Sequence, residues 1–209
     1  SLPESEIVSL PSSALEISSG TSPVKDTAWK EDKASNHQMR EDVLQSLHTA
    51  LLESDIHAMA IIKDGYLVDE FYNSGYDKTS VFALNSCTKS FTSALVGIAL
   101  QEGLLDDLDE SIAAYFPSIA NTPKADITIR HLLEHKSGLE WYEWTRNGES
   151  FYELNRSANW VEYVLGKPLV YTPGTHFTYT TGGSHLLSAI LEQAVGGDLF
   201  SYAKAHLFD

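Results

Sequence analysis

The sequence predicts an α/β fold of the α+β kind, in which a small antiparallel sheet is flanked by helices and followed by a helical region. Three patterns predict it. Apolar residues recur at helical spacing over about 39–54, two β-rich runs flank a turn over 56–72, and residues 86–103 open polar and continue as an apolar helix. The elements beyond these are mostly helical.

The hairpin is the clearest strand signal. The runs from Ile56 to Ile62 and from Tyr66 to Tyr72 lie on either side of Asp64-Gly65, a dipeptide that favours two-residue hairpin turns. An isolated hairpin is only marginally stable in water, because its apolar face needs further strands or a covering layer. Either the sheet is therefore very small, or strands that complete it are missing from this sequence.

The helices follow from periodicity and from their stop signals. The first is amphipathic, and the helix over 86–103 is buried on most sides and ends at Gly103. Residues 141–156 are expected to form an aromatic-rich loop. Further helical patterns cover about 110–116, 127–136, 157–165, 184–195 and 198–206.

Composition excludes several classes of function. The 209 residues include 14 Lys+Arg and 29 Asp+Glu, which gives a net charge of −15 and argues against nucleic acid or anionic membrane as a partner. A single cysteine, Cys87, excludes a disulfide framework and a multi-cysteine zinc site. No apolar run has the length of a membrane span. Residues 1–38 are rich in Ser, Pro and charge, and predict a flexible leader or linker of an exported, extracytoplasmic protein.

A candidate nucleophile lies at the start of the apolar helix. Ser86 and Lys89 are at positions i and i+3, so a helix places both side chains on one face. Unpaired N–H groups at a helix N-terminus stabilise an alkoxide and the oxyanion of an acyl-transfer intermediate. The same pattern occurs at Ser22/Lys25 and Ser201/Lys204, but without a buried helix behind it. The alternative is a simple N-cap with a surface lysine.

A second candidate is Tyr179, within the segment from Pro173 to Leu187. Pro173-Gly174 predicts a turn, and Gly182-Gly183 a break before a helix capped by Ser184. A phenol in this tight loop, if it lies close to Lys89, can act as a general base. The alternative is a core tyrosine bonded to the backbone.

Together these segments resemble the serine β-lactamase-related family, which includes class C β-lactamases, penicillin-binding proteins, serine esterases and aminohexanoate-oligomer hydrolases. The resemblance covers about 40–209 and lies in 86–90, 127–139 and 173–190. It implies a β-lactamase/penicillin-binding-protein-like fold and a serine hydrolase that cleaves a small or peptide-like ester or amide substrate through an acyl-enzyme. It also implies that Ser86 is acylated, that Lys89 and Tyr179 activate it, and that no metal or organic cofactor is needed.

Within this resemblance we expect a sheet portion with the hairpin and the nucleophile helix over 39–104, and a helical subdomain with Tyr179 over 105–209. The family's second motif is often Tyr-x-Asn, but Thr181 stands in place of Asn. This favours esterases and amide hydrolases over true β-lactamases. Thr181, Trp141 and Tyr142 are expected to contact substrate. The third motif, Lys-Thr-Gly or His-x-Gly, is absent after Tyr179. The resemblance implies that this motif and the strands that complete the sheet come from a C-terminal segment or chain beyond this sequence.

Two rival interpretations stay open. His131-Leu-Leu-Glu134-His135 matches the inverted zinc-peptidase pattern, although its apolar spacing predicts a packed helix ended by Gly138. A non-catalytic relative that binds cell-wall peptides or acts as a sensor module is the other alternative. The combination of Ser86, Lys89 and Tyr179 argues against a pure binder.

Overall fold

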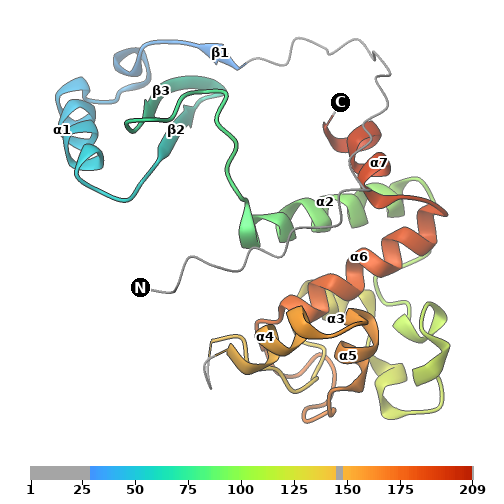
Figure 1. Cartoon of the computed structure of the whole chain (residues 1–209). Coiled ribbons are helices and arrows are strands. Elements are labelled where there is room, and N and C mark those ends of the chain that lie inside the picture. Colours follow the sequence, from blue (N-terminus) through green and yellow to red (C-terminus); the bar gives the residue numbers. More distant parts are fainter. Residues whose placement is uncertain (1–28, 145–147, 209) are drawn as a thin grey trace. The chain divides into compact units, whose positions relative to one another are not determined.

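The computed structural model of the protein describes residues 29–144 and 148–208. The chain divides into two compact units, with the boundary between Ser80 and Val81 (Figure 1). The helix of Ser86 thus lies in the second unit, whereas we expected it to group with the hairpin in 39–104. Its packing explains the difference, because it lies against later helices of the chain.

The first unit contains a three-stranded sheet in the order β1-β3-β2, with β1 at Lys30–Glu31, β2 at Ala58–Lys63 and β3 at Tyr66–Tyr72. The predicted hairpin is β2–β3, which pair antiparallel, whereas β1 pairs parallel with β3. Both turn residues, Asp64 and Gly65, have positive φ (54° and 80°), as a two-residue hairpin turn of type I′ requires.

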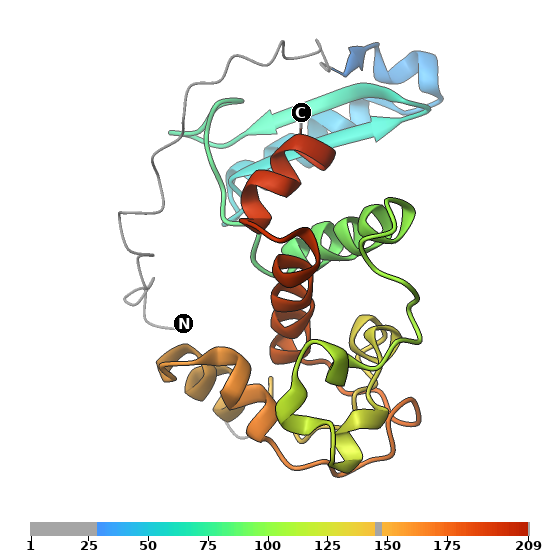
Figure 2. The ribbon, with the colours of Figure 1, turned by 90° about the vertical axis from the view of Figure 1, so that its right-hand side faces the viewer.

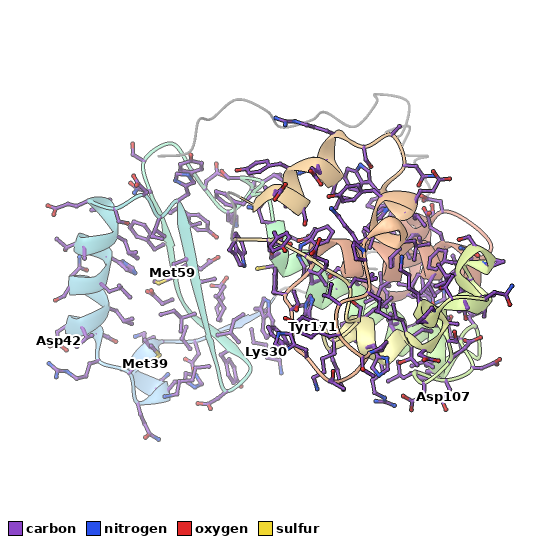
Figure 3. The ribbon with its side chains drawn as sticks, turned by 90° about the horizontal axis from the view of Figure 1, so that it is seen from below. Lys30, Met39, Asp42, Met59, Asp107 and Tyr171 are labelled. Atoms are coloured by element: carbon purple, nitrogen blue, oxygen red, sulfur yellow. The ribbon has the colours of Figure 1, made fainter. Side chains whose placement is uncertain are left out.

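A small core joins this sheet to helix α1 (Glu41–Leu52). Its buried members are Ala34, Leu44 and Val68, and Met39, labelled in Figure 3, packs against them. Residues 30–38 thus form β1 and a 3₁₀ helix (Ala34–His37) instead of the flexible leader expected over 1–38. Ala34 and His37 are buried there, which the polar composition of the segment concealed. The rest of the expected leader, 1–28, lies outside the described residues.

The second unit is helical and has one core of its own. α2 packs against α6, and α6 also contacts α3 and α5 (Figure 2). The core includes Val96 and Ala99 from α2 and Leu186 and Ile190 from α6. The described helices are α2 (Thr88–Gln101), α3 (Ile129–Leu133), α4 (Glu149–Arg156), α5 (Trp160–Gly166), α6 (Thr181–Val195) and α7 (Leu199–Ala203), followed by a π-helical turn (Lys204–Phe208). Short 3₁₀ helices cover Asn85–Cys87, Ile112–Ala114, Pro117–Ile119 and Pro123–Asp126.

Several helix boundaries differ from the predicted ones. The range 110–116 contains only a 3₁₀ turn, and α4 lies in the range expected to be a loop, where its buried Ser150 and Leu154 are four residues apart. α6 begins at Thr181 instead of Ser184, because the Thr180 hydroxyl caps it by accepting the Gly183 N–H at 3.1 Å. Gly182-Gly183 therefore forms the first turn of α6 and does not break the chain.

Glycine at 182 has a packing reason. A Cβ built there would lie 2.6 Å from the Trp141 ring and 2.7 Å from a Val164 methyl carbon. The first turn of α6 can approach Trp141 this closely only because residue 182 has no side chain.

No helix within the described ranges is long and apolar enough to cross a bilayer.

The first prediction concerns the buried His37, whose Nδ1 lies 3.0 Å from Asp64 Oδ2 and whose Nε2 lies 3.1 Å from Asp32 Oδ2. The hydrogen bond to Asp64, with a further one to Asp32, raises the pKa of His37 above its usual value. The folded state thus holds the proton more tightly than the unfolded state. Its stabilisation is complete below about pH 6.5 and is lost as pH rises through the raised pKa of folded His37.

The measurement is amide hydrogen exchange at Asp32, whose N–H donates to the Leu67 carbonyl at 3.2 Å. His37→Gln should lower its protection factor most between about pH 4 and 6.5, above the usual Asp range, and progressively less at higher pH. An equal loss of protection at pH 5.5 and pH 9 would contradict a charge-dependent role of His37.

The second prediction is that Gly182→Ala lowers the free energy of unfolding by about 1–3 kcal/mol, because the added methyl group forces Trp141 or Val164 to move. Gly97→Ala is the matched control. Gly97 is an exposed position of α2 with no atom within 4 Å of a built Cβ, so this change should be neutral or stabilising by about 0.5–1 kcal/mol. Denaturant unfolding of the full-length protein measures both, and equal stability of the two variants would refute the packing argument.

Candidate active site

Ser86 lies in the 3₁₀ turn Asn85–Cys87, which leads directly into α2. Asn85 has a φ of 47°, a left-handed conformation that a short polar side chain tolerates better than most. The turn leaves Ser86 exposed, with its side chain on the same face as Lys89. Lys89 Nζ lies 3.2 Å from Ser86 Oγ, which is the proximity that the i, i+3 spacing predicts.

Lys89 has a second partner 92 residues further along the chain. Its Nζ also lies 3.2 Å from the hydroxyl oxygen of Thr181, the first residue of α6. The contact exists because α2 and α6 share one core and their N-terminal ends meet. Lys89 therefore bridges the candidate nucleophile and the start of α6.

Tyr179 lies at the same site. The centre of its ring is 5.0 Å from Lys89 Nζ. The ring is stacked on one neighbour, His135, at 4.8 Å and on another, Trp144, at 6.0 Å between ring centres. Tyr179 lies near the end of the loop between α5 and α6, which also contains Tyr171, labelled in Figure 3. These contacts hold the phenol ring beside Lys89.

His135 is placed by an unusual helix end. It has a φ of 55°, and its N–H donates to Leu132 O at 3.2 Å while the Lys136 N–H donates to His131 O at 2.7 Å. This is a Schellman motif in which His135 occupies the left-handed position that glycine usually takes. The prediction that Gly138 ends this helix is therefore wrong.

Gly138 instead allows the backbone at Tyr171 to approach closely. Its φ is 79°, and a Cβ built there would lie 2.2 Å from the Tyr171 carbonyl oxygen. The loop that leads to Tyr179 crosses the backbone at this point, so no side chain fits.

The imidazole of His135 is neutral at pH 7. Burial lowers its pKa, and the nearby charge of Lys89 lowers it further. Its Nδ1 accepts the Thr180 N–H at 3.2 Å, so the proton of the neutral ring lies on Nε2. His135 thus supports both the ring of Tyr179 and the cap residue of α6.

Glu143 is a site residue that the sequence did not reveal. One carboxylate oxygen accepts the Thr181 hydroxyl, and the other accepts the Thr181 N–H at 3.0 Å and the indole N–H of Trp141. No local pattern signals this role, because Glu143 reaches Lys89 only through a residue 38 positions away.

The expected substrate-contacting residues have different surroundings. Trp141 is only 6% exposed and belongs to the core, where it packs on Gly182 and donates to Glu143, and its contact with substrate stays a prediction. The Tyr142 hydroxyl donates to Glu140 at 3.2 Å, and its contact with substrate stays a prediction. The aromatic residue exposed beside Tyr179 is Trp144, at 77%.

The two histidines of the zinc-peptidase pattern serve the backbone. His131 Nδ1 accepts the Thr128 N–H at 3.2 Å in a capping box, and His135 Nδ1 accepts the Thr180 N–H. Within the described ranges, no three His, Cys, Asp or Glu side chains gather as a metal ligand set would. Glu134 pairs instead with Lys136 at 2.9 Å.

The chain is similar to known proteins in sequence and in structure. The chain is 28% identical over 188 residues to the N-acetylmuramyl-L-alanine amidase of Bacillus subtilis, covering 76% of this chain and 42% of the relative. It is 26% identical over 132 residues to penicillin-binding protein 4* of the same organism, covering 62% and 28%. The solved structure of the D-alanine carboxypeptidase AmpC from Burkholderia cenocepacia superposes with a TM-score of 0.60 at 23% identity, covering 81% and 48%.

The chain spans less than half the length of each of these three proteins. The structural likeness places it in the β-lactamase/penicillin-binding-protein fold, with only part of the neighbour's length covered. The Beta-lactamase family model matches residues 50–209, which include α2, α3 and α6 with all of the site described above. The chain therefore belongs to the Beta-lactamase family, whose members are serine hydrolases.

Proposed function

We propose that this chain carries the nucleophile and the proton-transfer groups of a serine hydrolase that cleaves an amide or ester bond of a small peptide-like substrate through an acyl-enzyme. The observation that carries the proposal is the position of Lys89 Nζ, 3.2 Å from both Ser86 Oγ and Thr181 Oγ1. A serine hydroxyl needs an adjacent base to become a nucleophile, and this is the distance at which a base acts.

The proposed reaction has two stages. Ser86 Oγ attacks the carbonyl carbon while its proton passes to neutral Lys89, and the backbone N–H of Ser86 stabilises the oxyanion. The proton then passes, with Tyr179 taking part, to the leaving amine or alcohol, which departs to give the acyl-enzyme. Water attacks the ester of Ser86 in the second stage, and the same groups return its proton to Ser86 Oγ.

The name of one relative, an N-acetylmuramyl-L-alanine amidase, supports an amide bond as the target. Cell-wall peptides are the substrate class that we propose, which implies action outside the cytoplasm. A non-catalytic binding module is the weaker alternative, because binding alone does not need a lysine held on a serine hydroxyl.

We also propose that activity requires further strands and a third motif from a C-terminal segment or chain. In the described part of the sheet, β1 has two residues and the outer edge of β2 has no partner strand. Natural proteins cover or pair such edges.

The third prediction is that Ser86 is the labelled residue when the full-length protein reacts with a fluorophosphonate or a fluorescent penicillin. Ser86→Ala should abolish labelling and lower ester turnover by at least about 10³-fold, because it removes the nucleophile. Ser86 is exposed, so the variant should keep the melting temperature of the wild type.

Cys87→Ala is the matched control, since Cys87 is the exposed neighbour in the same turn and its removal should leave labelling intact. Peptide mass spectrometry locates the label. Labelling that persists in Ser86→Ala would overturn the proposal, and a label on Cys87 would assign the nucleophile to the thiol.

The fourth prediction is that residues 1–209 expressed alone give neither a single cooperative unfolding transition nor ester turnover, because the described sheet is small and leaves the outer edge of β2 unpaired. The full-length protein should show both. Full turnover and sharp unfolding of 1–209 alone would show that the sheet needs no further strands.

A further inference from the structure

Glu143 has a contact set that the proposed reaction does not use. It is half-buried, and it accepts three hydrogen bonds from two residues: the hydroxyl and N–H of Thr181, and the indole N–H of Trp141. Trp141 is itself buried in the core. A carboxylate tied at both oxygens in this way has a fixed orientation, and it is aimed at the one side chain of α6 that touches Lys89.

The single proton of the Thr181 hydroxyl determines which partner donates and which accepts in its two hydrogen bonds. A threonine hydroxyl has one proton to donate and lone pairs to accept with. An ionised carboxylate only accepts, so the proton of Thr181 Oγ1 points to Glu143. Lys89 Nζ donates an N–H to a lone pair of the same oxygen, and it can do so both as the ammonium and as the neutral amine that accepts the Ser86 proton. The two hydrogen bonds of the Thr181 hydroxyl therefore depend on each other: it can accept from Lys89 in this orientation because its own proton is bound by Glu143.

We propose that Glu143 is a positioning residue for Lys89, acting through Thr181. The carboxylate orients the hydroxyl so that its lone pair holds Lys89 Nζ within reach of Ser86 Oγ, and the two side chains together form one composite acceptor. This inference rests on the proposed function, since it assigns a residue that holds the base of that reaction in place.

The other neighbours of Lys89 cannot replace this acceptor. His135 is neutral at pH 7, and its Nδ1 already accepts the Thr180 N–H. Tyr179 presents its ring to Lys89 at 5.0 Å. Ser86 Oγ is the group to be activated and cannot serve as a permanent anchor. Among the described residues, Glu143 is the carboxylate that hydrogen bonds connect to Lys89.

The proposal distinguishes threonine from asparagine at 181. A side-chain amide oxygen carries no proton and can accept from Lys89 without help. A hydroxyl presents its lone pair to Lys89 reliably only when a second acceptor holds its own proton. Glu143 should therefore matter when residue 181 is Thr and should matter little after Thr181→Asn. If Glu143 only supported Trp141 and the start of α6, its loss would slow acylation by the same factor in the wild type and in Thr181→Asn.

The test measures the rate of Ser86 acylation by a fluorophosphonate in the full-length protein. Glu143→Gln should slow acylation by about 10–100-fold, because a small displacement of a catalytic group is enough for such a loss. In the Thr181→Asn background the same change should cost less than about threefold. Glu149→Gln is the matched control at the exposed first residue of α4, and it should have no effect.

Two outcomes would overturn the proposal: Glu143→Gln acylates as fast as Glu149→Gln, or it loses the same factor in both backgrounds. A double-mutant cycle with Lys89→Met and Glu143→Gln, measured by the free energy of unfolding of the full-length protein, tests the role of Glu143 without an activity assay. Coupling between Lys89 and Glu143 should be measurable and should disappear in the Thr181→Val background. If Ser86→Ala is labelled like the wild type, the proposed function fails, and the cycle still decides the role of Glu143.

Discussion

The site depends on the packing of α2 against α6. Val96 and Ala99 of α2 and Leu186 and Ile190 of α6 are buried in one core, and the N-terminal ends of the two helices meet as a result. Close approach at that end also needs Gly182, which leaves room for Trp141. Without this packing, Lys89 would keep its local contact with Ser86 and lose its anchor on Thr181.

A second set of constraints shapes the loops around the point where the N-terminal ends of α2 and α6 meet. His135 takes a left-handed conformation that turns the chain after α3 and places its ring against Tyr179. Gly138 lets the loop before Tyr179 cross close to the backbone. Thr180 then starts α6 with a side-chain cap. Backbone geometry at these few positions sets where the ring of Tyr179 lies, and its contacts with His135, Trp144 and Lys89 hold it there.

The sequence predicted what depends on local spacing. Ser86 and Lys89 meet because they are one helical turn apart, and the β2–β3 hairpin follows from two β-rich runs around Asp64-Gly65. The family and its fold were also predictable, since three motifs with their flanks identify them. The start of α6 was predicted three residues too late, because a double glycine usually breaks a chain and here fills a packing site.

What depends on tertiary contact was not predictable. Glu143 is one of 29 acidic residues, and only the fold shows that it meets Thr181. Trp141 was expected to contact substrate, and only the fold shows that it is buried against Gly182 and bonded to Glu143. Residues 30–38 were expected to be flexible because of their polar composition, yet Lys30 and Glu31 pair with β3, and Ala34 and His37 are buried.

The central claim is that Lys89, held between Ser86 and Thr181, is the group that activates Ser86. A crystal structure of the full-length protein after reaction with a fluorophosphonate tests it most directly. The account predicts phosphorus bonded to Ser86 Oγ, with Lys89 Nζ within about 3.5 Å of both that oxygen and Thr181 Oγ1. An adduct on another residue, or a Lys89 side chain turned away from the adduct, would contradict it.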